Sequence, residues 1–136
     1  MKLGLSFAAV ALLAASSAAS AQSVEVVNQF GPQVQPVTIN QSSQIFNVAA
    51  VLQVTSSGSP TATINQTGPT NVVGILQFGG LNSSAATGQS GVVNIAGIGQ
   101  VGNTTSSLLT QMGNLNTGAI MQIGMSNSSF VSQSTP

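Results

Sequence analysis

A glutamine recurs along the chain at nearly constant spacing, and this repeat constrains the fold more than any other feature. Successive glutamines stand 12, 12, 13, 11, 12, 11, 11, 11 and 11 residues apart. They are Gln29, Gln41, Gln53, Gln66, Gln77, Gln89, Gln100, Gln111, Gln122 and Gln133. A fixed short period is the signature of repeat architectures, whose units bury their apolar faces only by stacking on one another. We therefore expect ten arms of 11–13 residues to stack into one repeat domain, residues 22–136.

Two other kinds of residue keep phase with the glutamines. Asn or Ser stands six residues before seven of them, at Ser23, Asn47, Asn71, Ser83, Asn94, Asn116 and Asn127. Glycine stands two residues after seven of them, at Gly31, Gly68, Gly79, Gly91, Gly102, Gly113 and Gly124. Because glycine adopts positive φ without strain, we expect these glycines to form the turns between arms.

Within each arm, residues alternate with period two, which is the periodicity of a β-strand. Position b, two residues before the glutamine, is aliphatic in nine of the ten arms, and Thr87 is the exception. The nine are Val27, Ile39, Val51, Ile64, Ile75, Ile98, Leu109, Ile120 and Val131. Position a, two residues before b, is mostly small. One face of each arm is thus apolar at its centre and carries amides at its ends.

These features predict an all-β fold, a β-solenoid of about five two-strand coils with cross-β stacking. The small a and larger b side chains are expected to fill a thin interior between two parallel sheets. Equivalent Asn and Gln residues are expected to stack into ladders, because a buried amide without a partner costs about 1–3 kcal/mol. Glu25 falls at position a of the first arm, and burying a lone carboxylate is unfavourable. We therefore expect that terminal arm to be frayed.

The first 21 residues have the pattern of a secretory signal peptide, a helical segment removed in the mature protein. Lys2 supplies a basic start, residues 3–15 form an apolar run, and Ala19-Ser20-Ala21 matches the A-x-A cleavage pattern before Gln22. The apolar run is shorter than the roughly 20 residues that span a bilayer. The sequence therefore predicts a secreted protein whose mature chain is residues 22–136.

Charged residues are nearly absent, and their absence excludes most classes of function. The chain has one basic side chain, Lys2, and one acidic side chain, Glu25, with no His and no Cys. General acid–base catalysis, metal binding and nucleic-acid binding each need groups that are missing. We therefore expect neither an enzyme nor a cofactor, metal, nucleic-acid partner or small-molecule substrate. A neutral, polar and β-prone composition is instead typical of cross-β assemblies.

The arms resemble the curlin repeat, the building unit of curli fibres, whose form is S-x5-Q-x-G-x-x-N-x-A-x3-Q. One complete repeat runs from residue 83 to residue 100, through Ser83, Gln89, Gly91, Asn94, Ala96 and Gln100. The resemblance covers essentially all of the mature chain. The Asp, Lys and Arg residues that typical curlins carry are absent after residue 21.

The resemblance implies a structural subunit of an extracellular functional-amyloid fibre, or pilus, that serves cell adhesion and biofilm formation. It implies export through the periplasm and an outer-membrane secretion channel, nucleation by a curli-type nucleator at the cell surface, and head-to-tail growth on other copies of the chain. The last arm, residues 127–133, is followed by no capping helix, so strand addition to an open edge is expected. A minor nucleator and a monomeric β-solenoid adhesin or surface-binding module remain the alternatives.

Overall fold

The alternating arms form eight β-strands in the computed structural model, which describes residues 22–31, 37–42, 45–55, 58, 60–79 and 82–136. The strands are β1 (Gln22–Phe30), β2 (Val37–Ser42), β3 (Phe46–Thr55), β4 (Thr61–Thr67), β5 (Thr70–Gly79), β6 (Asn82–Ser90), β7 (Val93–Met112) and β8 (Leu115–Ser134). The predicted signal peptide lies outside the described residues. Within them there is no helix, and so none with the length and apolarity to cross a membrane.

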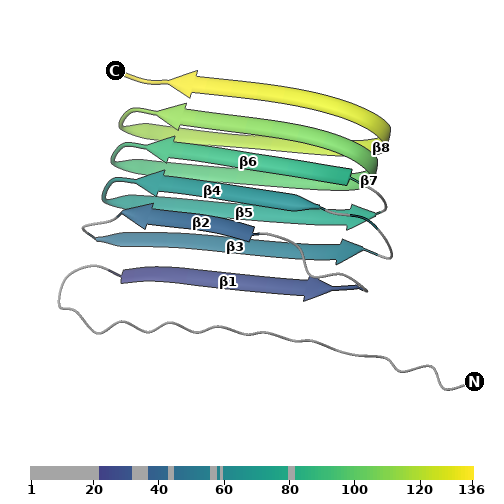
Figure 1. The fold of residues 1–136 in the computed structure, drawn as a ribbon. Helices are drawn as coiled ribbons and strands as arrows, with labels where there is room; N and C mark the ends of the chain where they lie inside the picture. Colours follow the sequence, from purple (N-terminus) through teal and green to yellow (C-terminus); the bar gives the residue numbers. More distant parts are fainter. Residues whose placement is uncertain (1–21, 32–36, 43–44, 56–57, 59, 80–81) are drawn as a thin grey trace, which may run out of the picture.

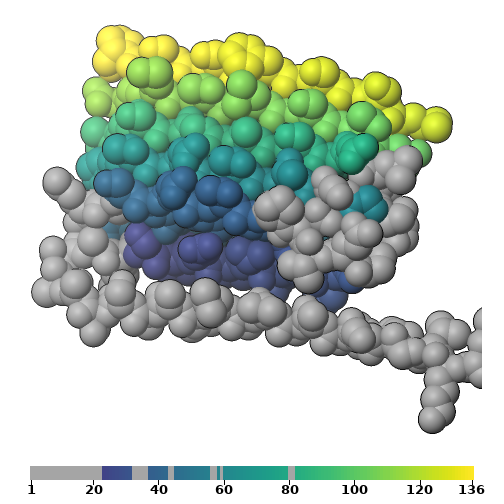
Figure 2. All heavy atoms as spheres, in the orientation of Figure 1, coloured from purple at the N-terminus to yellow at the C-terminus, as the bar shows by residue number. Residues whose placement is uncertain are grey.

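The strands stack in two rows, and every pairing is parallel (Figure 1). The odd row contains β1, β3, β5, and the first parts of β7 and β8, residues 93–101 and 115–123. The even row contains β2, β4, β6, and the second parts of β7 and β8, residues 104–112 and 126–134. Together the rows make a parallel β-solenoid of about four turns. Figure 2 shows the same stacking as layers that follow the sequence from one end of the molecule to the other.

We expected about five coils. Each row contains four successive pairings, so the described strands account for about four turns. A fifth coil would have to be closed by the connection between β1 and β2, and residues 32–36 of that connection lie outside the described residues.

The register of the pairing follows the glutamine repeat. Gln53 pairs with Gln29 on one side and with Gln77 on the other, and Val51 and Ile75 pair at position b. A one-residue slip would move every inward side chain to the outside. The buried apolar and amide positions therefore hold all the strands in one register.

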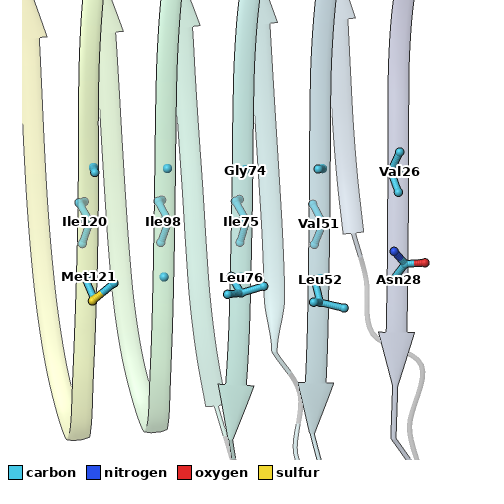
Figure 3. Close-up of a pocket in the computed structure, with 14 residues that line it drawn as sticks. Val26, Asn28, Val51, Leu52, Gly74, Ile75, Leu76, Ile98, Ile120 and Met121 are labelled. Carbon is cyan, nitrogen blue, oxygen red and sulfur yellow. The ribbon is translucent and has the colours of Figure 1, made fainter.

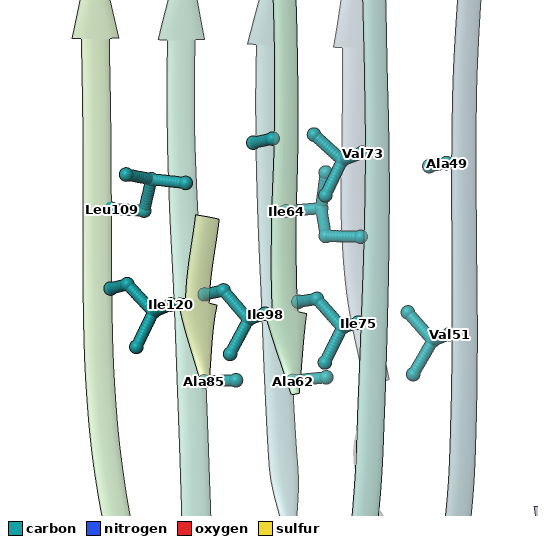
Figure 4. Packing of buried hydrophobic residues seen from close by; sticks show 11 residues of the cluster. Ala49, Val51, Ala62, Ile64, Val73, Ile75, Ala85, Ile98, Leu109 and Ile120 are labelled. Atoms are coloured by element: carbon teal, nitrogen blue, oxygen red, sulfur yellow. The ribbon is translucent and has the colours of Figure 1, made fainter. Parts of the chain in front are cut away.

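The apolar interior is a thin layer in which large and small side chains face each other. Its buried members are Ala49, Val51, Ala62, Ile64, Val73, Ile75, Ala85, Ala96, Ile98, Leu109 and Ile120. Figure 4 draws Ala62 and Ala85 of the even row at the level of the isoleucines and Val51 of the odd row. The contact recurs at the C-terminal end, where a methyl group added to Gly118 would lie 3.1 Å from Leu109 Cδ1. Position a of one row thus faces position b of the other, which explains why a is small.

The turns between arms contain the predicted glycines, but two of them do not interrupt a strand. In β7 and β8 the strand continues through the bend, and Gly102 and Gly124 carry the positive φ there, at 154° and 144°. The chain changes rows at these bends while keeping its stacking with the neighbouring coil. The 11-residue period is therefore short enough for a bend rather than a loop.

The expected fraying of the first arm is wrong. β1 pairs with β3 along its whole length, and Glu25 stands beside Ala49 in the predicted register. Glu25 is nevertheless exposed, because β1 is the terminal strand of its row. Pairing along one edge is enough to order the strand, and the Glu25 carboxylate stays exposed to solvent.

A turn glycine and a strand glycine should respond oppositely to substitution. Gly91 has φ 143°, and a methyl group added there would overlap the carbonyl oxygen of Gly113 in the next turn. Gly91→Ala should lower the free energy of unfolding by at least about 2 kcal/mol. Gly88 lies on a strand, and a methyl group added there would have nothing within 4 Å. Gly88→Ala should therefore change the free energy of unfolding by less than about 1 kcal/mol. The guanidinium chloride midpoint of the β-sheet circular dichroism signal measures both, and equal midpoints would contradict the assignment of Gly91 to a strained turn.

Candidate assembly interface: side-chain ladders and open edges

The glutamines form two continuous hydrogen-bonded ladders through the interior. In the odd row the Nε2 of each glutamine donates to the Oε1 of the next, from Gln29 to Gln53, Gln77, Gln100 and Gln122, at 2.8, 2.7, 2.8 and 3.2 Å. In the even row the ladder runs from Gln41 to Gln66, Gln89, Gln111 and Gln133, at 3.0, 3.0, 2.7 and 2.7 Å. Every bond in both ladders has its donor on the N-terminal side. The ladders therefore have a direction along the solenoid axis.

Most of these amides also tie the two rows together. Gln77 Nε2 donates to the Thr61 carbonyl oxygen at 3.0 Å, and Gln111 Nε2 donates to the Ile95 carbonyl oxygen at 3.1 Å. Corresponding bonds join the other glutamines from Gln41 onward, apart from Gln53, to backbone carbonyls of the opposite row. An amide has two N–H groups, so one serves the ladder and the other serves the opposite row. A buried amide is satisfied only when both neighbours are in register.

The Asn, Ser and Thr positions form a second kind of ladder, which runs the other way. Asn116 Nδ2 donates to Asn94 Oδ1 and Asn94 Nδ2 donates to Asn71 Oδ1, both at 2.9 Å, and Asn71 Nδ2 donates to Asn47 Oδ1 at 3.2 Å. In the even row Thr105 Oγ1 donates to Ser83 Oγ at 3.0 Å. These donors lie on the C-terminal side.

Two serines at position a take part in the network, a role that the repeat pattern does not indicate. Gln100 Nε2 donates to Ser107 Oγ at 2.9 Å, Ser107 Oγ donates to Gln122 Oε1 at 2.8 Å, and Gln122 Nε2 donates to Ser129 Oγ at 2.8 Å. In sequence they were only small residues. Their replacement of alanine in the last two even arms is the signal that could have identified them.

Several polar atoms are buried without a hydrogen-bond partner in the described part of the chain. They are Asn47 Nδ2, Thr87 Oγ1, Asn127 Nδ2 and Thr135 Oγ1. Thr87 is the polar exception among the b positions, and its hydroxyl lies in the apolar layer. Asn47 and Asn127 are the outermost buried or half-buried asparagines at the two ends of the solenoid, where a ladder stops.

The predicted site residues lie in two environments. Away from the ends of the solenoid, the side chains of the glutamines and b residues are at most 6 % exposed. At the ends they are half-buried, at Val27, Gln29, Ile39, Gln41, Val131 and Gln133. Among the phased Asn and Ser positions, Asn127 is half-buried and Ser23 is exposed. The same residue types are therefore covered in the middle and open at both ends.

The described residues contain no cluster of three or more His, Cys, Asp or Glu side chains that could hold a metal ion. The chemistry that the ends offer is hydrogen bonding and apolar contact. The even-row ladder reaches the C-terminal end with a group still able to bond, since Gln133 Nε2 has a single protein acceptor, the Thr117 carbonyl oxygen at 2.9 Å.

A two-row parallel solenoid with an in-register amide ladder in each row defines a repeat protein that is built by stacking. The family described as the curlin associated repeat matches residues 108–134. The chain therefore carries a curlin repeat, and the resemblance to the curlin family is confirmed. That family consists of structural subunits and not of enzymes. No curated protein and no solved structure matches the chain.

Removing one interior glutamine should destabilise the solenoid far more than removing an outer amide. Gln100 is fully buried and bonds to Gln77, Ser84, Ser107 and Gln122. Gln100→Met keeps the volume but leaves several buried groups unpaired, each worth about 1–3 kcal/mol. We expect the free energy of unfolding, derived from the guanidinium chloride midpoint, to fall by at least about 3 kcal/mol.

The control is Asn65→Leu. Asn65 Oδ1 also accepts a hydrogen bond from the side-chain amide of the residue one coil before, Asn40, at 3.0 Å. Asn65 lies on the outer surface, however. The expected change is under about 1 kcal/mol, because water replaces the lost bond. Similar losses for the two variants would mean that the interior ladder has no special role.

Proposed function

We propose that this chain is a structural subunit of an extracellular, curli-like functional-amyloid fibre that contributes to adhesion and a biofilm matrix. The observation that supports this most is that the two ends of the solenoid complement each other. Gln133 Nε2 has a single protein acceptor at the C-terminal end, and no described glutamine precedes Gln41, the first residue of the same ladder, at the other end. The same direction of hydrogen bonding can therefore continue from one copy into the next.

In this proposal β1 of an incoming copy pairs with the first part of β8. Continuing the register of the repeat places Gln29 over Gln122, Val27 over Ile120 and Ser23 over Asn116. Ser23 can donate its hydroxyl to Asn116 Oδ1, in keeping with the direction of the asparagine ladder. Strand addition supplies backbone hydrogen bonds, and the half-buried b residues at both ends become covered.

This contact is head to tail, so it does not close, and repetition gives a filament. Within such a filament the ten arms of each copy would give five coils. Export as a secreted chain after removal of residues 1–21, a curli-type nucleator and an outer-membrane channel belong to the same proposal. The curlin repeat supports them.

The expected fibre has a clear physical signature. The mature chain, residues 22–136, should assemble after a lag that seeds remove, and aligned fibres should give a meridional reflection at about 4.7–4.8 Å. Chain that stays monomeric under seeding would contradict the proposed function.

An inward charge on the last arm should block growth, while an outward charge on the same strand should not. Val131 is half-buried at position b, and Ser132 is exposed on the outer face. Val131→Lys would bury an unpaired ammonium group at each junction, which costs several kcal/mol. We expect its seeded elongation rate to fall by at least about tenfold. Ser132→Lys should stay within about twofold of the unsubstituted chain, and equal rates for the two variants would exclude the proposed junction.

Removing the carboxylate at the other end should have the opposite effect. The proposed register places Glu25 over Gly118, whose added methyl group would lie 2.9 Å from Gln133 Oε1 and 3.1 Å from Leu109 Cδ1. Joining two copies would then take water from a charged group. Glu25→Gln should elongate several-fold faster at neutral pH in the seeding assay. A slower rate for Glu25→Gln would show that the carboxylate assists the junction instead.

A further inference from the structure

The two outer faces of the solenoid differ in chemistry. On the odd row, outward side chains are mostly aliphatic or aromatic, including Val24, Phe30, Ile95, Val101, Met121 and Ile123, all of them exposed. On the even row they are mostly Ser, Thr and Asn, with Leu108, Met112 and Phe130 as exposed apolar exceptions towards the C-terminal end. Every second arm belongs to the same row, so these side chains gather into one apolar sheet face.

An open groove of about 470 Å³ crosses this face from strand to strand (Figure 3). Its floor is the outward column between positions a and b, made of the small residues Ala50, Gly74, Gly97 and Ala119, with Val26 at the β1 end. Its wall is the next outward column, made of Asn28, Leu52, Leu76, Gly99 and Met121. The groove thus runs along the solenoid axis, beside a ridge to which Leu52, Leu76 and Met121 contribute long apolar side chains.

The glycines in this groove have no reason within the chain to be glycine. A methyl group added to Gly74, Gly97 or Gly99 would meet nothing within 4 Å, and none of the three has the positive φ of the turn glycines. Glycine in a strand costs roughly 0.5–1 kcal/mol relative to alanine. Such a glycine often marks a place where another backbone or a ligand approaches closely. The approaching group must here come from outside the chain.

We propose that this apolar face is the site at which a second copy of the chain packs, so that solenoids associate side by side in pairs, face to face. The inference rests on the proposed function, because axial growth repeats the groove and the ridge along a fibre. In a two-fold arrangement the ridge of each copy enters the groove of the other, since ridge and groove lie two residues apart, or about 7 Å. The glycines let the two sheets approach closely.

The size and charge of the face fit this partner. Five stacked strand segments at about 4.8 Å, each about 33 Å long, give a face of about 800 Å², and a standard interface buries about 800 Å² on each partner. The face carries no charged side chain, so two identical faces meet without repulsion. An identical solenoid also has the same strand spacing, which lets every ridge residue meet an equivalent groove position.

Filling the groove tests the inference, because it adds apolar surface to the face while removing the hollow that the partner's ridge would enter. Fibres of the unsubstituted mature chain should have twice the mass per length of a single stack, as measured by scanning transmission electron microscopy. Gly74→Val with Gly97→Val should halve the mass per length, while the 4.7–4.8 Å reflection remains. If hydrophobicity alone drove the association, these valines would strengthen it.

Gly88→Val is the matched control, because Gly88 lies on the outer face of the even row and also has nothing within 4 Å of an added methyl group. It should leave the fibres paired. Met121 is a ridge residue that is 80 % exposed, so Met121→Ser should weaken the pairing of fibres without disturbing the interior. This variant replaces the double valine variant as the test if that variant fails to fold.

The outcomes separate the two proposals. Single stacks from the unsubstituted chain, or pairs that survive the valine substitutions, would overturn the lateral packing while leaving the fibre intact. If no fibre forms, the proposed function fails, and sedimentation of the soluble chain then decides the inference: a dimer that the valines dissociate supports it, and a monomer overturns it.

Discussion

The structure depends on the requirement that a buried side-chain amide have partners both above and below it. A solenoid whose interior is only a few side chains across has little apolar volume, and two glutamines in each coil cross that volume. Because an interior glutamine such as Gln77 donates both to the next glutamine and to the opposite row, it is satisfied only when its neighbouring coils are in register. The ladders therefore make the stacking specific, while the b residues supply the apolar contact between rows. Neither contribution suffices without the other.

The direction of the ladders gives the molecule two unlike ends. Glutamine bonds have their donors on the N-terminal side, and asparagine bonds have theirs on the C-terminal side. A new coil added at either end is therefore accepted in one orientation only. The last described arm has the same residue types as those in the middle of the molecule, differing mainly in how far they are covered. An interior that repeats along its axis is complementary to itself, which is why the proposed assembly needs no surface other than its own terminal coils.

The glycines fall into two groups with different physical roles. Turn glycines such as Gly91 have positive φ and lie against the carbonyl oxygen of the next turn, so the chain itself requires them. Strand glycines such as Gly97 have ordinary strand backbones and open space above them. The first group determines how tightly the coils stack. The second group shapes the outer surface of the odd row, where apolar side chains gather on a molecule that is almost free of charge.

The sequence by itself determined the stacking unit, because phase along an arm is a local property. The period of the glutamines, the aliphatic b positions and the turn glycines predicted a solenoid, and Ile98 and Gln100 lie inside it as that pattern predicts. Tertiary structure decided what depends on which arms meet. It placed position a against position b, brought Ser107 into the glutamine ladder, gave the ladders their direction, and ordered β1 although Glu25 seemed to forbid it. It also gathered the outward residues of every second arm into one apolar face. These features arise between coils, and a single strand contains no information about which neighbour the coiling will bring beside it.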